Sequence, residues 1–173
     1  MIAFILCVCG LTSATKDNAP TFESIFSQLQ KNGRIWVHRR SFEGDGMRCI
    51  FNEKLLLKGE DYIFNKWHKS GEKMVKNVAH GKIYKVQGEK NWKSAMNVTT
   101  IPQGLIKTYI LQFWDSRQQC GVLTSDDEAG KKQCELHSLA QVGRPFEKCL
   151  KRYRNQCKDE TYIEYIINNV NCN

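Results

Sequence analysis

The sequence predicts an all-β fold, in which about eight antiparallel strands form a closed barrel or a sandwich. Eight segments alternate apolar and polar residues with a period of two and are rich in β-branched and aromatic residues. They span residues 34–42, 47–57, 62–69, 73–86, 91–99, 105–114, 119–124 and 132–140. Turn signals such as Ser70-Gly71 and Gln87-Gly88 separate them. The length of 173 residues suits one domain.

Two helical segments flank the predicted strands. The first follows Thr21, a suitable N-cap, and its apolar residues recur at helical spacing: Phe22, Ile25, Phe26 and Leu29. The second is expected at residues 146–158, where three residues spaced four apart share one face: Cys149, Tyr153 and Cys157. That face can point at the sheet, and an extended piece at residues 162–170 then leads to Cys172.

Residues 1–14 predict a signal peptide. They are strongly apolar, but shorter than the roughly 20 residues that span a bilayer, and they end in Thr12-Ser13-Ala14, a pattern that suits signal peptidase. The usual basic start is missing, and a buried N-terminal strand is the alternative. Because a polar stretch follows at once, we favour a signal peptide and expect residues 15–173 to be one secreted domain without a membrane span.

The cysteine count supports secretion. The chain has 8 cysteines, and 6 are left once Cys7 and Cys9 leave with the signal peptide: Cys49, Cys120, Cys134, Cys149, Cys157 and Cys172. An even number in a secreted chain indicates disulfides. Their spacing contains no CxxC pair, so no metal site is expected. Asn97 begins the sequon Asn97-Val98-Thr99 and is a candidate glycosylation site.

The sequence contains none of the common catalytic motifs. There is no GxSxG elbow, no P-loop and no GxGxxG after a strand. The histidines are scattered, and no cysteine is left over as a nucleophile. We therefore expect no catalytic residues and no cofactor, but a barrel with room for one small ligand.

The formal net charge of +8 is compatible with binding to polyanionic partners. The lysines and arginines are spread through many segments rather than gathered in one stripe. We therefore favour a solubilising surface and expect no nucleic-acid partner. Binding of a host protein or a glycosaminoglycan through the basic outer surface is the alternative function.

A family resemblance rests on a cysteine motif in three parts: Cys120-Gly121-Val122, then Cys134-Glu135-Leu136-His137, then Cys149. From about Phe22 onward the chain resembles the tick salivary lipocalins, the family of the tick histamine-binding proteins. The resemblance implies an eight-stranded lipocalin barrel, with a short N-terminal helix and a C-terminal helix packed on the wall. It also implies the disulfides Cys49–Cys172 and Cys120–Cys149, which leave Cys134–Cys157 as the third pair.

By the same resemblance, the protein is a secreted monomer that sequesters a small host mediator and counters inflammation or haemostasis. The mediator is an amine such as histamine or serotonin, or an eicosanoid or fatty acid. Gly121 and His137 stand where the family has an acidic or amide residue and a Trp, which weakens the case for an amine near them. Phe42 and Asp45 stand where amine binders keep an aromatic residue and an aspartate, and Tyr109 matches an aromatic position that faces the cavity.

Strand alternation adds candidates of its own. Trp36, Arg40 and Phe42 fall on one face of the first strand, and Lys107 and Tyr109 share a face of the sixth. Arg40 or Lys107 favours a carboxylate-bearing lipid if it points inward, but not if it faces outward or reaches the barrel mouth.

The candidate ligand-binding residues are therefore Trp36, Arg40, Phe42, Asp45, Tyr109 and Glu135. Asp45 and Glu135 are candidate partners for an amine. Arg40 is the candidate partner for a lipid carboxylate, and we expect such a lipid to bind more tightly than histamine.

Overall fold

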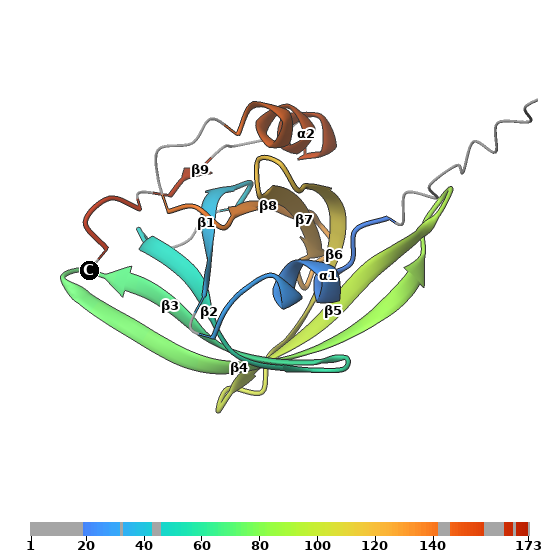
Figure 1. Cartoon of the computed structure of the whole chain (residues 1–173). Coiled ribbons are helices and arrows are strands. Elements are labelled where there is room, and N and C mark those ends of the chain that lie inside the picture. Colours follow the sequence, from blue (N-terminus) through green and yellow to red (C-terminus); the bar gives the residue numbers. More distant parts are fainter. Residues whose placement is uncertain are drawn as a thin grey trace, which may run out of the picture.

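A computed structural model describes residues 19–31, 33–42, 46–141, 146–157, 165–167 and 169–172. Its main feature is an antiparallel barrel whose eight strands run in chain order: β1 Arg34–Arg40, β2 Arg48–Lys58, β3 Asp61–Ser70, β4 Lys73–Gln87, β5 Trp92–Ile101, β6 Ile106–Asp115, β7 Cys120–Asp126 and β8 Lys132–Ser138. Each strand pairs with the next, and β1 pairs with both β8 and β2, which closes the sheet. The structure confirms the predicted all-β barrel (Figure 1).

The first strand contains an irregularity that matters for the site. Between Val37 and Arg39 its register against β8 shifts by a bulge. A bulge adds one unpaired residue and changes which side chains face inward. Beyond it, Arg40 pairs directly with Glu135 of β8.

Helix α1 (Phe22–Ser27) covers one end of the barrel (Figure 1). Thr21 caps its first turn, as expected. The ammonium of Lys54 donates to the carbonyls of Phe26 and Leu29, at 2.8 and 2.7 Å, and satisfies acceptors at the helix end. The ring of Phe26 stacks on Tyr62, with centroids 3.9 Å apart. This end of the barrel is therefore filled with aromatic side chains.

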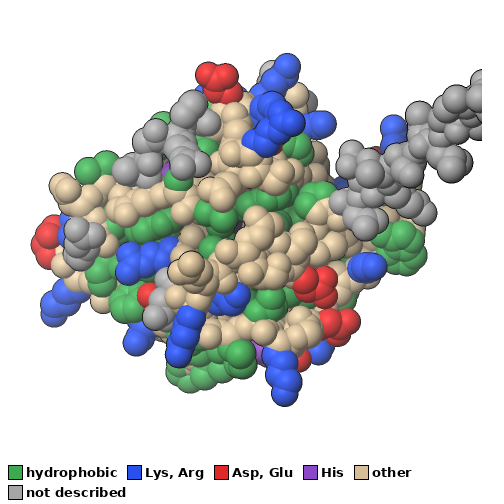
Figure 2. All heavy atoms as spheres, viewed as in Figure 1, with side chains coloured by type: hydrophobic (Ala, Val, Ile, Leu, Met, Phe, Trp, Pro, Cys, Tyr) green, Lys and Arg blue, Asp and Glu red, His purple; other side chains and the backbone are tan. Residues whose placement is uncertain are grey.

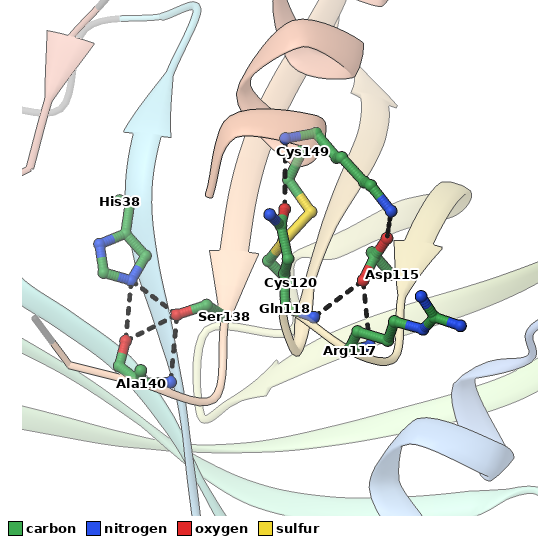
Figure 3. Close-up of a disulfide and its surroundings, with 9 residues drawn as sticks. His38, Asp115, Arg117, Gln118, Cys120, Ser138, Ala140 and Cys149 are labelled. Atoms are coloured by element: carbon green, nitrogen blue, oxygen red, sulfur yellow. Dashed lines mark hydrogen bonds and ion pairs between the residues drawn. A yellow bond between two sulfur atoms is a disulfide. The ribbon is translucent and has the colours of Figure 1, made fainter. Parts of the chain in front are cut away.

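Helix α2 (Glu147–Cys157) packs on the outer wall against β6, β7 and β8. Two disulfides hold it there, Cys120–Cys149 and Cys134–Cys157, and the first is drawn in Figure 3. The third, Cys49–Cys172, fastens the C-terminal segment to β2. These are the three expected pairs.

One short strand adds to the sheet in the described part of the C-terminal segment. It is β9 (Tyr165–Ile166), which lies within the expected extended piece and pairs with β1. The predicted signal peptide at residues 1–14 lies outside the described residues. No helix of the described part is both long and apolar enough to cross a membrane.

Candidate functional site

A cavity of about 300 Å³ lies inside the barrel, in the half away from α1. It is built by the ends of β1, β3 and β5 and the starts of β2, β4 and β6, together with β7 and β8. Much of its wall is apolar, formed by Val37, Phe42, Met47, Ile50, Phe64, Met96, Val98 and Leu123. Its volume is at the lower end of the range for small-molecule sites, which is about 300–1,000 Å³.

Glu135 is the only carboxylate among the described residues of this wall, and two partners already hold it. Its Oε1 lies 3.2 Å from Nε of Arg40, and its Oε2 accepts a hydrogen bond of 2.7 Å from Nε2 of His137. The contact with Arg40 is an ion pair only, because neither of its two atoms makes a hydrogen bond in the described structure. Burial alone would raise the pKa of Glu135, but Arg40 and His137 outweigh it and hold the pKa well below its usual range.

Two lysines bring further positive charge into the cavity. Lys107 donates to Oε1 of Gln133 at 2.7 Å, and its Nζ lies 4.5 Å from the ring centre of Phe42. Lys66, on β3, makes no hydrogen bond or ion pair with any residue of the described ranges, although it is partly buried. Burial lowers the pKa of both lysines, and the nearby charge of Arg40 adds to this effect while Glu135 opposes it.

Most of the predicted ligand-binding residues meet in this cavity. Four of them line it: Arg40, Phe42, Tyr109 and Glu135. Lys107 lines it as well, so Arg40 and Lys107 both point inward.

Trp36 does not line the cavity, and the expectation for this residue was wrong. It packs on the other face of β1 with Cys49, Phe51 and Cys172. Period-two counting failed because the bulge after Val37 reverses the alternation, so Val37 and Arg40 both face the cavity.

Asp45 and Asn97 are the other two candidate residues of the sequence. Asp45 lies outside the described residues. Asn97 lies on β5, where its side-chain oxygen accepts hydrogen bonds from the hydroxyls of Tyr84 and Thr108, both at 2.8 Å.

Comparison with known proteins identifies the family. Residues 14–173 match the family model described as tick histamine binding protein, which covers almost the whole chain. The chain belongs to the tick histamine-binding protein family. No curated protein matches the chain. Membership in this ligand-binding family, together with the barrel, makes it a lipocalin-like protein that binds a small ligand.

At Gly121, where the resemblance implied an acidic or amide residue, the structure leaves no room for a side chain. A Cβ on Gly121 would lie 2.6 Å from Cε3 of the Trp114 ring and 2.6 Å from the carbonyl oxygen of Phe113. The cavity that Trp114 and His137 line with residues of α1 measures about 30 Å³. That volume is about the share of one water molecule in the liquid.

Sequence reasoning missed Lys66 and His68. Both belong to β3, and both line the cavity. Alternation puts them on the same face as Tyr62 and Phe64, so the strand pattern carried the signal. Nothing in the pattern shows which of the two faces of a strand points inward.

Proposed function

We propose that this protein is secreted and sequesters a small host mediator in its barrel cavity, which removes the mediator from host receptors at the bite. The observation that carries the proposal is the cavity, with α1 over one end of the barrel and both apolar and charged side chains on its wall. Three disulfides suit an extracellular protein. Binding alone is the mechanism.

Native mass spectrometry and calorimetry of the secreted protein test this proposal. The panel contains histamine, serotonin, arachidonic acid and a leukotriene. We expect at least one of them to form a complex of one ligand per chain. If an amine binds, Asp45→Asn is expected to abolish its binding, because a buried ammonium would lose its counter-ion. A protein that binds none of the four would contradict the proposal.

A second candidate function is favoured by the outer surface of α2. Lys and Arg side chains gather over this helix (Figure 2). A groove between α2 and β6 is lined by Phe113, Asp115, Lys148, Lys151, Arg152 and Asn155. Asp115 lies 3.4 Å from Nζ of Lys148 and also accepts backbone hydrogen bonds from Arg117 and Gln118 (Figure 3). Lys151 and Arg152 add two further cations, which suits a sulfated glycosaminoglycan.

Salt separates the two candidates. Retention on heparin should fall steeply between 0.15 and 0.5 M salt, because exposed charges are screened within roughly 8 Å or less. Binding in the cavity should respond much less. If Lys151→Gln with Arg152→Gln elutes from heparin at the same salt as the unaltered protein, α2 is not the polyanion surface.

A further inference from the structure

We propose that the cavity selects an amphiphile with an anionic head group, and that Lys66, assisted by Lys107, binds that head group. This inference rests on the proposed function, since it assumes that the cavity is the ligand site. It names the ligand class by charge: a carboxylate on an apolar body, rather than an ammonium.

The first argument is the state of Lys66. Its side chain points into the cavity from β3, on the same face as Phe64 and His68. The described structure offers its ammonium no hydrogen bond and no ion pair, although an ammonium has three donors. Lys66 is partly buried, and a cation that loses part of its hydration without gaining a partner is destabilised. A ligand carboxylate would supply the missing acceptor.

The second argument is the charge balance of the cavity. Its described wall carries the cations Arg40, Lys66 and Lys107 and the single carboxylate of Glu135. That carboxylate is already shared between Arg40, at 3.2 Å, and His137, at 2.7 Å. An amine would have to break these contacts or stay unpaired among like charges. Because charges interact more strongly in a protein interior than in water, both options disfavour a cationic ligand.

The third argument corrects the expectation that Arg40 holds the head group. Arg40 is neutralised by its ion pair with Glu135, whereas neither lysine makes an ion pair with an acidic side chain of the described residues. Lys107 gives one of its donors to Gln133 and keeps others for a ligand. The two lysines are therefore the cations of the cavity whose charge is not already balanced by an ion pair.

The apolar part of the wall can take the body of the same ligand. Ile50, Phe64, Met96, Val98 and Leu123 line the cavity beside Lys66. Burying an alkyl chain against them stabilises the complex in proportion to the apolar area removed from water. Head group and tail together define a small amphiphile such as a medium-chain acid.

The test uses three straight-chain probes of ten carbons each, whose head groups are anionic, neutral and cationic: decanoate, 1-decanol and decylamine. Calorimetry at pH 7.4 would compare the unaltered protein with Lys66→Gln and Lys66→Arg. Lys58→Gln is the matched control, because Lys58 is an exposed lysine at the end of β2.

We expect decanoate to bind more tightly than decanol, and decylamine to bind most weakly. Lys66→Gln should weaken decanoate by about 10- to 100-fold, the range for one hydrogen bond between charged groups. The same variant should leave decanol within about threefold, which also shows that its cavity is intact. Lys66→Arg should keep most of the decanoate affinity, and Lys58→Gln should keep all of it.

The contrary outcomes are distinct. Equal affinity for decanoate and decanol would overturn the anion preference but leave the cavity as a ligand site. Tighter binding of decylamine or histamine would overturn the ligand class. A decanoate affinity that Lys66→Gln does not change would overturn the role of Lys66. Failure of these three probes together with histamine, serotonin, arachidonic acid and the leukotriene would refute the proposed function itself.

Discussion

Replacing Glu135 with Gln should destabilise the protein and at the same time strengthen its binding of an anion. The substitution keeps the size of the side chain and removes its charge. At 3.2 Å and an effective dielectric constant of about 20, the attraction between Arg40 and Glu135 is about 5 kcal/mol. Breaking a buried ion pair by removing one partner typically costs 3–5 kcal/mol. Because Gln can still accept from His137, we expect a loss of about 3 kcal/mol.

Urea unfolding at pH 7 measures this loss. With a slope of about 2 kcal/mol per molar urea, the midpoint should fall by about 1.5 M. Glu72→Gln is the control, because the Glu72 side chain is 85% exposed in its pair with Arg48 and exposed pairs contribute roughly 0–1 kcal/mol. In the same Glu135→Gln protein, decanoate should bind more tightly than in the unaltered chain. A midpoint that moves no further than that of the control, or a weaker affinity for decanoate, would refute this account of the charge cluster.

Two further predictions concern stability. Replacing Cys49 and Cys172 with Ala should lower the free energy of unfolding by about 5 kcal/mol, and replacing Cys134 and Cys157 by about 3.5 kcal/mol. The difference follows from loop entropy, because the sequence separations are 123 and 23 residues. Denaturant titration that gives the opposite order would contradict this prediction. Burial lowers the pKa of His38 from 6.5 to about 4. Between these two pH values the unfolded chain binds a proton on His38 that the folded chain does not. The free energy of unfolding should therefore fall as pH drops through this window, by up to about 3 kcal/mol. His38→Asn should flatten that slope in thermal unfolding measured from pH 7 to pH 4, and an unchanged slope would assign it to other groups.

The barrel was predictable because its signals are local. Alternation along each strand and turn residues between strands gave eight strands in the right order, and the helical spacing of Phe22 and Phe26 gave α1. Cys149, Tyr153 and Cys157 follow one another at intervals of four residues, and this spacing correctly indicated the face of α2 that meets the wall.

The charge arrangement of the site was not predictable, because it depends on contacts between distant parts of the chain. Arg40 and Glu135 become neighbours only through the pairing of β1 with β8. The bulge in β1 has no residue signature, so Trp36 was assigned to the wrong face. Lys66 stood out only when the partners of the other charged groups were known, because its distinguishing property is the lack of a partner within the described structure.

The central claim, that the ligand binds inside the barrel, is tested most directly by blocking the cavity. Thr100 lines it near the end of β5, and Ile101, the next residue, is exposed on the outer wall. Native mass spectrometry with decanoate would compare Thr100→Trp with the matched control Ile101→Trp. The account predicts a complex of one ligand per chain that Thr100→Trp abolishes and Ile101→Trp retains. A complex that persists undiminished in a folded Thr100→Trp protein would place the ligand elsewhere and contradict the account.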